Sequence, residues 1–112
     1  MSELNVAVIG CGYWGPNLIR NFAECKYTRV KYVVDLLPER LAKLSRRYPG
    51  TEFLSDLDKV LKDPDLHAVV IATPVHTHYK LARQALLAGK HVLVEKPMCS
   101  SSAECLDLIA LA

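Results

Sequence analysis

Short, nearly continuous hydrophobic runs alternate along the chain with segments in which apolar residues recur at helical spacing. The runs are Val6 to Ile9, Val30 to Val34, Ala68 to Ala72 and Val92 to Val94, with a weaker run at Glu52 to Leu54. Such runs are typical of parallel strands that helices cover on both faces, and the weaker one suits an edge strand. The positions that predict the covering helices are Leu18, Ile19 and Phe22, then Leu41 and Leu44, then Leu81, Ala82, Ala85 and Leu86.

Residues that favour helix ends flank these segments. Pro38 can occupy a first helical turn, and Ser55 precedes Asp58 by three residues, which suits the start of a helix. Gly50 and Gly89 follow helical runs, where a left-handed cap is expected. Strand and helix therefore alternate along the chain. With right-handed crossovers this order predicts an α/β fold, a doubly wound parallel sheet of strand order 3-2-1-4-5 with a sixth strand still to follow.

The last segment predicts a helix that the chain does not complete. Ser101 and Glu104 form a capping box, but the sequence reaches Ala112 with no glycine or proline to end the helix. We therefore expect residues 1–112 to be one domain, truncated before its sixth strand. The strand from His91 to Glu95 would then lie at a bare sheet edge, whose unpaired backbone groups predict self-association or covering by a partner. A homo-oligomer is expected.

Composition and charge exclude several classes of protein. Of 112 residues, 51% are hydrophobic and 23% are charged, as in one ordinary soluble domain. Fourteen Lys and Arg against twelve Asp and Glu are spread in mixed clusters, so we expect no nucleic-acid partner. The pair Arg46 and Arg47 suits a solvated last turn of a helix. The longest apolar strand, Ala68 to Ala72, is too short to cross a bilayer, and the first residues do not resemble a secretion signal. We therefore expect a cytoplasmic protein with no membrane partner.

Four cysteines occur at positions that suggest no shared site. They are Cys11, Cys25, Cys99 and Cys105. None forms a C-x-x-C pair, and no His lies at metal-ligand spacing from any of them. We therefore expect neither a metal site nor a disulfide framework, and interpret the cysteines as buried free thiols.

The first strand runs directly into a glycine pattern with a known chemical use. Gly10, Gly12 and Gly15 fit G-x-G-x-x-G between a strand and a helix. A pyrophosphate must approach backbone N–H groups at the start of a helix, where a side chain on the loop would block it. The first glycine permits the tight turn, the second lets the phosphates approach and the third lets the helix pack closely. Tyr13 and Trp14 would face the ligand mainly through their backbone amides.

An acidic residue at the end of the second strand bears on the choice of cofactor. Asp35 lies twenty residues beyond Gly15. A carboxylate there can accept hydrogen bonds from the adenosine ribose hydroxyls but would repel a 2′-phosphate. The nearby Arg40 weakens this argument, although it equally suits a solvated helix position. The sequence thus favours NAD over NADP.

Two further motifs resemble one family. The stretch IATPVHTHYKLARQALLAGKHVLVEKP, together with VAVIGCGYWG, resembles the N-terminal Rossmann domain of the Gfo/Idh/MocA oxidoreductases over essentially the whole chain. In that family a second α/β domain, absent here, forms the substrate pocket and supplies an Asp and a His for proton transfer. The signatures that carry the resemblance are Thr73-Pro74 with a following His, and Glu95-Lys96-Pro97.

These motifs leave the fourth and fifth strands at the same edge as the glycine turn. Ligands of doubly wound sheets bind at that edge, so both motifs can flank the nicotinamide half of a cofactor. The residues concerned are Ala72, Thr73 and Pro74 after one strand, and Glu95, Lys96 and Pro97 after the other. By resemblance, Lys96 lies beside the nicotinamide and the substrate hydroxyl, where it could stabilise alkoxide charge or shuttle a proton. Glu95 could orient Lys96 or simply end the strand.

The histidines are harder to assign. His78 occupies the family's histidine position after T-P, which places it among the candidate cofactor-binding residues, while His76 is an additional histidine in the same loop. A histidine near a helix start more often caps or packs than catalyses. Val75 stands where the family frequently has Asn, so any polar contact made by that Asn would be missing. His67 and His91, at strand entries, are interpreted as structural.

The function that follows is NAD binding within a dehydrogenase. The resemblance implies hydride transfer between nicotinamide and a secondary hydroxyl of a sugar, sugar nucleotide or cyclitol, with this chain alone binding cofactor without turnover. The alternative is a non-catalytic module that senses or responds to NAD(H). Such a module needs the glycine turn and Asp35 but has no use for Lys96.

Overall fold

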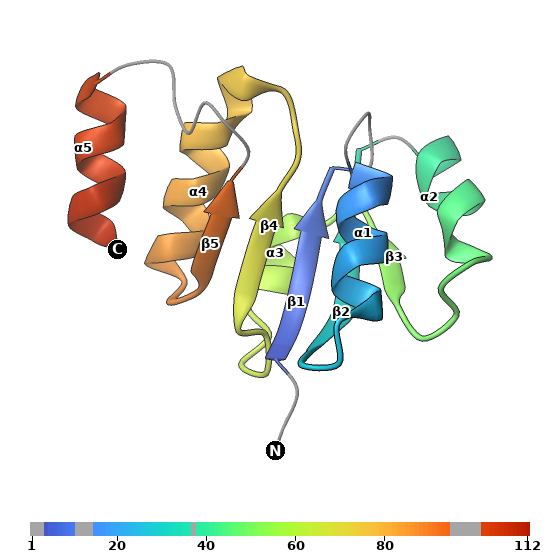
Figure 1. Cartoon of the computed structure of the whole chain (residues 1–112). Helices are drawn as coiled ribbons and strands as arrows, with labels where there is room; N and C mark the ends of the chain where they lie inside the picture. Colours follow the sequence, from blue (N-terminus) through green and yellow to red (C-terminus); the bar gives the residue numbers. More distant parts are fainter. Residues whose placement is uncertain (1–3, 11–14, 37, 95–101) are drawn as a thin grey trace.

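The computed structural model describes residues 4–10, 15–36, 38–94 and 102–112. Within these ranges parallel strands alternate with helices (Figure 1). The strands are β1 (Leu4–Ile9), β2 (Thr28–Val34), β3 (Glu52–Leu54), β4 (Ala68–Ile71) and β5 (His91–Val94). The helices are α1 (Gly15–Glu24), α2 (Pro38–Ser45), α3 (Leu57–Leu61), α4 (His78–Leu87) and α5 (Ser102–Leu111), with a 3-10 turn, η1 (Val75–Thr77).

The described strands form one parallel sheet of order β3-β2-β1-β4-β5, which confirms the predicted topology. β1 lies at its centre, and its last residue, Ile9, pairs with Val34 of β2 and Ile71 of β4. These three strands therefore end at the same level. We call this end of the sheet the carboxyl edge and the opposite end the amino edge.

Helices cover both faces of the sheet, as the continuous apolar runs predict. Alternate residues of β1 enter two separate cores: Val6 and Val8 pack with α1 and α2, whereas Ala7 and Ile9 pack with α3, α4 and α5. In Figure 1, α1 and α2 lie in front of the sheet and α3 lies behind it. Because β1 is buried on both faces, the turn that follows it is held from both sides.

Two of the predicted helix-end signals are confirmed. α2 begins at Pro38, and Gly89 has the left-handed φ of +80° expected after α4. The predictions of a helix start at Ser55 and of a left-handed cap at Gly50 are wrong. The N-cap of α3 is Asp56, whose side chain accepts a hydrogen bond from the Lys59 N–H at 3.2 Å. Gly50 does not have a positive φ.

The physical reason for the Gly50 error is the way in which α2 ends. The N–H groups of Arg47 and Tyr48 donate to the carbonyls of Leu44 and Ser45, at 3.0 and 3.3 Å. These tightened turns satisfy the last helical carbonyls, so no left-handed residue is needed. Arg46 and Arg47 accordingly lie in the exposed turn after α2 and not in its last turn.

A bulge in β2 creates a feature that the hydrophobic pattern does not reveal. Val6 of β1 pairs with Val30, but Ala7 pairs with Tyr32, so Lys31 has no partner residue in that ladder. The extra residue brings the side chains of Lys31 and Tyr32 to the same acceptor, Oδ2 of Asp63. The Lys31 ammonium lies 2.5 Å from it, and the Tyr32 hydroxyl donates to it at 2.6 Å.

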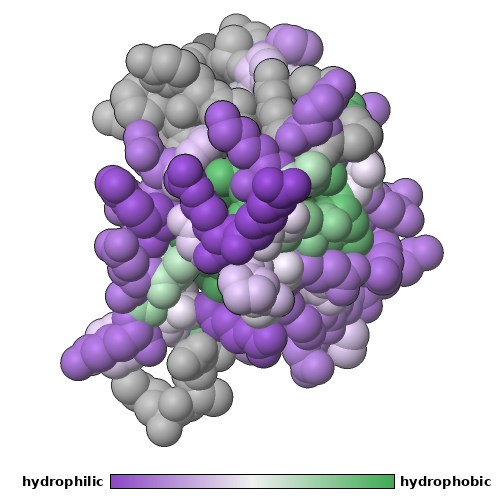
Figure 2. Space-filling model, turned by 90° about the vertical axis from the view of Figure 1, so that its right-hand side faces the viewer, coloured by the Kyte–Doolittle hydropathy of each residue, from purple (hydrophilic) through white to green (hydrophobic). Residues whose placement is uncertain are grey.

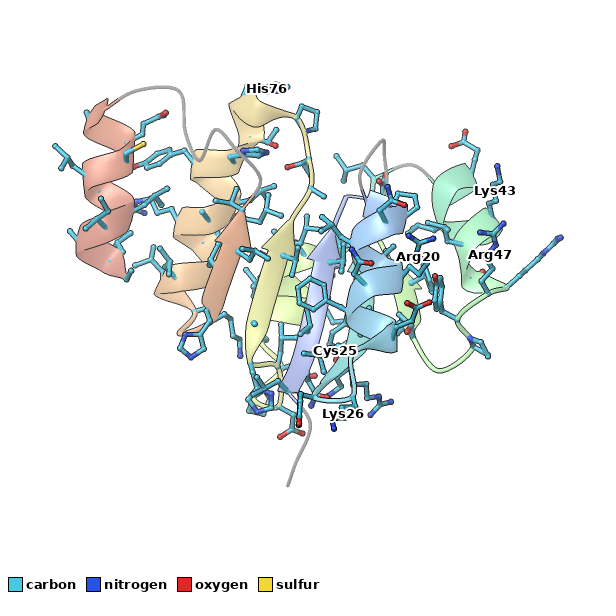
Figure 3. The ribbon with its side chains drawn as sticks, viewed as in Figure 1. Arg20, Cys25, Lys26, Lys43, Arg47 and His76 are labelled. Atoms are coloured by element: carbon cyan, nitrogen blue, oxygen red, sulfur yellow. The ribbon has the colours of Figure 1, made fainter. Side chains whose placement is uncertain are left out.

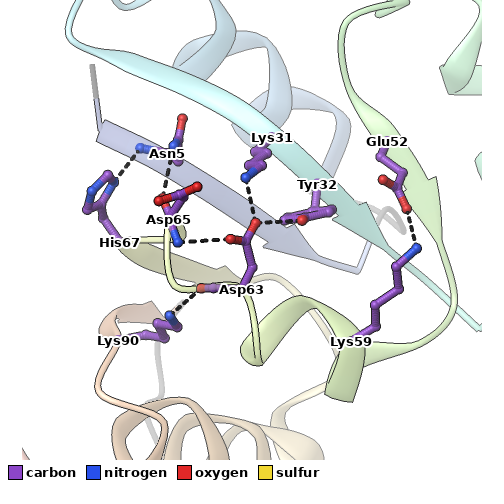
Figure 4. A network of polar contacts seen from close by, with 9 residues as sticks. All are labelled: Asn5, Lys31, Tyr32, Glu52, Lys59, Asp63, Asp65, His67 and Lys90. Carbon is purple, nitrogen blue, oxygen red and sulfur yellow. Dashed lines mark hydrogen bonds and ion pairs between the residues drawn. The ribbon is translucent and has the colours of Figure 1, made fainter. Parts of the chain in front are cut away.

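Asp63 connects three segments near the amino edge (Figure 4). Its other carboxylate oxygen accepts the backbone N–H of Asp65 at 2.8 Å, and its carbonyl accepts from the buried Lys90 ammonium at 2.7 Å. The segment between α3 and β4 is thereby tied to β2 and to the start of β5. The Lys31 ammonium, followed by the Tyr32 hydroxyl, holds the pKa of Asp63 well below its usual range, and the same carboxylate raises the pKa of Tyr32 to about 12.

The two histidines at strand entries differ in their roles. His67 is structural as predicted, because its Nδ1 accepts the Asn5 N–H at 2.9 Å. His91 contributes its backbone N–H, which donates to the His67 carbonyl at 3.0 Å, while its residue is exposed. Both contacts align the amino ends of β1, β4 and β5.

The two outer strands of the described sheet, β3 and β5, differ in polarity. At β3, Glu52 forms an ion pair with Lys59 at 3.0 Å, and the surface seen from this side is largely hydrophilic with a smaller hydrophobic area (Figure 2). At β5, Leu93 is 54% exposed. Charges discourage association through an edge strand, whereas an exposed apolar side chain does not. Self-association through β5 stays a prediction.

α5 packs beside α4 through its inner face. Leu108 is buried in the core, and the Tyr79 hydroxyl donates to the Asp107 carboxylate at 2.7 Å. Arg83 lies 3.3 Å from the same carboxylate. The hydrogen bond to Asp107 raises the pKa of Tyr79.

The expectation of four buried free thiols is wrong. Cys25 is free but exposed, in the turn that follows α1. Cys105, on α5, is disulfide-bonded. Sequence spacing did not indicate this bond because disulfide formation depends on proximity in the fold. Cys11 and Cys99 lie outside the described residues.

Membrane-spanning helices and metal-ligand clusters are both absent from the described ranges. No helix there has the length and apolar character needed to cross a membrane. No group of three or more His, Cys, Asp or Glu side chains there is placed to hold a metal ion.

The Asp63 contacts predict a large loss of stability when the carboxylate is removed. We expect Asp63→Ala to lower the free energy of unfolding by about 2–4 kcal/mol, because it leaves Lys31 and Tyr32 without their charged acceptor. Urea denaturation at pH 7 measures the loss. Asp65→Ala is the matched control, since Asp65 lies in the same segment and is exposed, and it should cost less than about 0.5 kcal/mol.

The same contacts predict how this loss depends on pH. The pKa of Asp63 is lower in the folded than in the unfolded protein, so its stabilising effect is fully present above the unfolded value of about 4 and disappears as pH falls through the folded value. The difference in unfolding free energy between wild type and Asp63→Ala should therefore shrink progressively below about pH 4. A difference that grows on acidification would contradict the assigned ion pair.

Candidate functional site

Three segments meet at the carboxyl edge of the sheet. Gly10 follows β1, Asp35 follows β2 and Ala72 follows β4. Since β1 lies between β2 and β4, Asp35 is on one side of Gly10 and Ala72 is on the other. The topology thus brings together three of the segments that the sequence singled out.

Gly10 lies where the β1 turn and the β4 turn come closest. Its φ is +93°, a left-handed value that L side chains rarely adopt. A Cβ at this position would lie 2.8 Å from Cγ2 of Thr73 and 3.0 Å from the carbonyl carbon and oxygen of Ala72. Glycine is therefore required both by the turn and by the close approach of the two segments.

Backbone hydrogen bonds hold this junction. The Gly10 N–H donates to the Val34 carbonyl at 2.7 Å, and the Ala72 N–H donates to the Ile9 carbonyl at 2.8 Å. The helix α1 begins at Gly15, as expected for a turn that leads into a helix. Apart from Pro16, which has no N–H, the first residues of this helix have N–H groups without an intrahelical acceptor, and these can receive an anion.

The acidic residue after β2 is buried at the same edge. Asp35 is only 8% exposed, and its backbone N–H donates to the Leu54 carbonyl of β3 at 3.2 Å. Leu36, the next residue, is 82% exposed. The chain therefore places a carboxylate at the end of β2, followed by an apolar side chain at the surface.

The segment from Thr73 to His78 forms a compact hydrogen-bonded turn. The Thr77 hydroxyl oxygen lies 2.6 Å from the Thr73 hydroxyl and 2.6 Å from the Pro74 carbonyl oxygen. Nε2 of His78 lies 2.7 Å from the Thr73 carbonyl oxygen. His78 is 2% exposed, so it packs within the protein as expected for a histidine at a helix start.

The basic side chains labelled in Figure 3 are spread over several elements. In Figure 3, Arg20 lies on α1, Lys43 lies on α2 and Arg47 follows α2, while His76 lies at the η1 turn beside the carboxyl edge. All four are exposed. Their spread agrees with a mixed surface charge and not with a continuous basic stripe.

The predicted cofactor-binding residues are divided between the described ranges and the rest of the chain. Gly12, Tyr13, Trp14, Glu95, Lys96 and Pro97 lie outside the described residues. Gly10, Gly15, Asp35, Ala72, Thr73, Pro74 and His78 lie within them. Their assignment to a cofactor stays a prediction.

Thr77, which no sequence motif singles out, connects Thr73 with Pro74 through its hydroxyl. Its position just before α4 is where a threonine normally caps a helix with its side chain, but no such cap hydrogen bond forms. The hydroxyl is used within the turn instead. Sequence patterns alone contain no signal for this choice, because both uses require the same residue type at the same place.

The arrangement fits a dinucleotide lying across the carboxyl edge. The turn after β1 leaves no space for a side chain at Gly10 and leads into a helix whose N–H groups can hold phosphate oxygens. The Asp35 carboxylate, which follows β2, can accept hydrogen bonds from ribose hydroxyls. The polar turn after β4 lies on the other side of Gly10 from Asp35. The residues present are therefore chemically suited to such a ligand.

Comparisons with known proteins agree with this geometry. Residues 4–112 match the oxidoreductase family described as having an NAD-binding Rossmann fold, known as GFO_IDH_MocA. The chain is 34% identical to inositol 2-dehydrogenase of Mycolicibacterium smegmatis, over 97% of this chain and 32% of that protein. It superposes on GenD2 of gentamicin A biosynthesis, solved with NAD, with a TM-score of 0.94 and 34% identity over 100% of this chain and 32% of GenD2.

A third relative was solved with a different cofactor. A mutant of KijD10, a 3-ketoreductase from Actinomadura kijaniata, in complex with TDP-benzene and NADP, gives a TM-score of 0.91 and 27% identity over 99% of this chain and 35% of that chain. The chain thus spans about a third of the length of these relatives. The match over residues 4–112, together with the sheet order and the close turn at Gly10, shows that the chain belongs to the Gfo/Idh/MocA oxidoreductase family with its NAD-binding Rossmann fold.

Proposed function

We propose that residues 1–112 form the dinucleotide-binding domain of an NAD-dependent dehydrogenase. The observation that carries the proposal is the junction at Gly10, where a turn too close for any side chain leads toward α1 between Asp35 and Thr73. A cofactor laid across this edge has its adenosine near β2, its pyrophosphate near β1 and its nicotinamide near β4.

The residues of this chain bind and orient the cofactor. N–H groups at the start of α1 hold the pyrophosphate, and Asp35 accepts hydrogen bonds from the adenosine ribose. When bound, the nicotinamide supplies a site that accepts or releases a hydride. Lys96 donates a hydrogen bond to the reacting oxygen of the substrate and lowers the cost of negative charge there.

The substrate is proposed from the relatives. Inositol 2-dehydrogenase and the 3-ketoreductase are named for reactions on a cyclitol and at a keto group. A secondary hydroxyl of a sugar, sugar nucleotide or cyclitol is the shared chemistry. The remaining groups for turnover lie in a second domain, so residues 1–112 bind cofactor without catalysing the reaction.

Calorimetric titration of the chain with NADH and NADPH tests the proposal. We expect NADH to bind at least about tenfold more tightly, because the Asp35 carboxylate repels the 2′-phosphate of NADPH. Asp35→Asn should narrow this preference by strengthening NADPH binding. Asp65→Asn, near the amino edge, is the matched loss of one carboxylate and should leave the preference unchanged. Tighter binding of NADPH by the wild type would refute the cofactor assignment.

Substitution of Gly10 tests the close approach. Gly10→Ala should destabilise the fold by about 2–3 kcal/mol and weaken NADH binding at least tenfold, because it combines a left-handed φ with the contact to Ala72 and Thr73. Gly89→Ala is the control, since Gly89 has a φ of +80° but no atom within 4 Å of its added Cβ. It should cost about 1 kcal/mol and leave NADH affinity intact. Equal effects of the two changes on affinity would exclude a role for the junction.

Substitution of Lys96 distinguishes a dehydrogenase from a non-catalytic sensor of NAD(H). Lys96→Ala should leave NADH affinity within about twofold and reduce turnover by at least about a hundredfold in the full-length enzyme that contains this domain. Lys80→Ala, an exposed lysine on α4, is the control and should change neither quantity. Undiminished turnover in the Lys96 variant would favour the sensor.

A further inference from the structure

Thr77 departs from the usual behaviour of a threonine before a helix. A threonine at the N-cap normally accepts an N–H from the first turn, which stabilises the helix by about 1 kcal/mol. Thr77 makes no such side-chain bond to α4. Its hydroxyl oxygen instead lies 2.6 Å from both the Thr73 hydroxyl and the Pro74 carbonyl oxygen. Departures from such local rules are expected at functional or strained sites.

The two short contacts determine where the protons lie. Each O···O distance of 2.6 Å requires a proton between the oxygens. Thr77 has one hydroxyl proton, and the Pro74 carbonyl has none. Both contacts are satisfied only if Thr77 donates to Pro74 and Thr73 donates to Thr77. The hydroxyl of Thr73 then has only lone pairs left for any other partner.

His78 holds the same residue through its backbone. A carbonyl oxygen can only accept, so the 2.7 Å contact between Nε2 of His78 and the Thr73 carbonyl means that Nε2 carries the proton. His78 is 2% exposed, which restricts the ring to one place. Thr73 is thus held by its hydroxyl, by its carbonyl and by the contact of its methyl group with the Gly10 turn.

We propose that Thr77 and His78 are positioning residues that present the half-buried Thr73 hydroxyl as a hydrogen-bond acceptor, so that the site recognises an N–H or O–H donor on the nicotinamide half of the cofactor. The inference rests on the proposed function, which places that half next to β4. The carboxamide N–H₂ and the hydroxyls of the nicotinamide ribose are the available donors. A carboxylate or phosphate oxygen, which has no proton to give, is disfavoured at the same position.

Four ligands distinguish the possible donors when their affinities for the 112-residue chain are measured by calorimetry. NAD has both the carboxamide and the second ribose. Nicotinic acid adenine dinucleotide replaces the carboxamide with a carboxylate, ADP-ribose lacks the nicotinamide, and ADP lacks the second ribose as well. The wild type, Thr77→Val and Thr77→Ser are compared, because valine removes the hydroxyl at nearly constant volume and serine restores it.

The proposal predicts that Thr77→Val weakens NAD binding about five- to tenfold, that Thr77→Ser binds NAD as the wild type does, and that neither change affects ADP. If the carboxamide is the donor, ADP-ribose is unaffected and the carboxylate analogue binds relatively better to Thr77→Val, since the freed Thr73 proton can then be donated to it. If the ribose is the donor, ADP-ribose weakens as much as NAD.

Three results would overturn the inference: unchanged NAD affinity in Thr77→Val, an equal loss for ADP, or a serine variant as weak as the valine variant. Thr51→Val is the matched control, because the Thr51 hydroxyl also donates to a backbone carbonyl, that of Val30, at 2.7 Å and outside the site. It should lose similar thermal stability and keep all four affinities. A wild-type chain that binds none of the ligands would refute the proposed function itself.

Discussion

The close approach of the β1 and β4 turns at Gly10 is the constraint on which the rest of the carboxyl edge depends. Only a residue without Cβ permits it, because the space that a side chain would need is taken by the backbone of Ala72 and the methyl group of Thr73. The junction exists because β1 and β4 are neighbours in a parallel sheet and end in register. A glycine selected for its turn therefore also determines how near the polar turn after β4 comes to the phosphate-binding segment.

The two ends of the sheet have different chemistry. Near the amino edge, Asp63 contacts Lys31 and Tyr32 of the bulged strand β2 through its carboxylate and Lys90 through its carbonyl. These contacts tie the segment before β4 to β2 and to the start of β5. At the carboxyl edge, the short hydrogen bonds lie within one turn, and the hydroxyl of Thr73 keeps unused acceptor capacity. A polar network with all of its members engaged stabilises the fold. A network with an acceptor left over can also bind a ligand.

Some helix-end signals in the sequence are ambiguous because neighbouring residues can have the same capping role. Ser55 and Asp56 are both good N-caps, and the structure uses Asp56 because α3 begins at Leu57. Gly50 resembles a helix cap in sequence, yet α2 ends earlier, with its carbonyls satisfied by a tightened turn. The cysteines illustrate a different limit, since the disulfide at Cys105 depends on a spatial proximity that residue spacing does not encode.

The strand order followed from the alternation of strands and helices together with the right-handed crossover rule, although β1 and β4, which pair in the sheet, lie far apart in sequence. Hydrophobic periodicity and motif spacing were sufficient for the glycine turn between β1 and α1 and for the family to which the chain belongs, since these motifs consist of residues close together in sequence. They also placed Asp35 and Thr73 at one edge, because parallel strands share their carboxyl ends. Packing was needed for the rest. One example is the bulge that brings Lys31 and Tyr32 to Asp63, and another is the Thr77 hydroxyl, which contacts Thr73 instead of capping its helix. Both depend on distances of a few ångströms between side chains. The sequence is equally compatible with other partners for these groups.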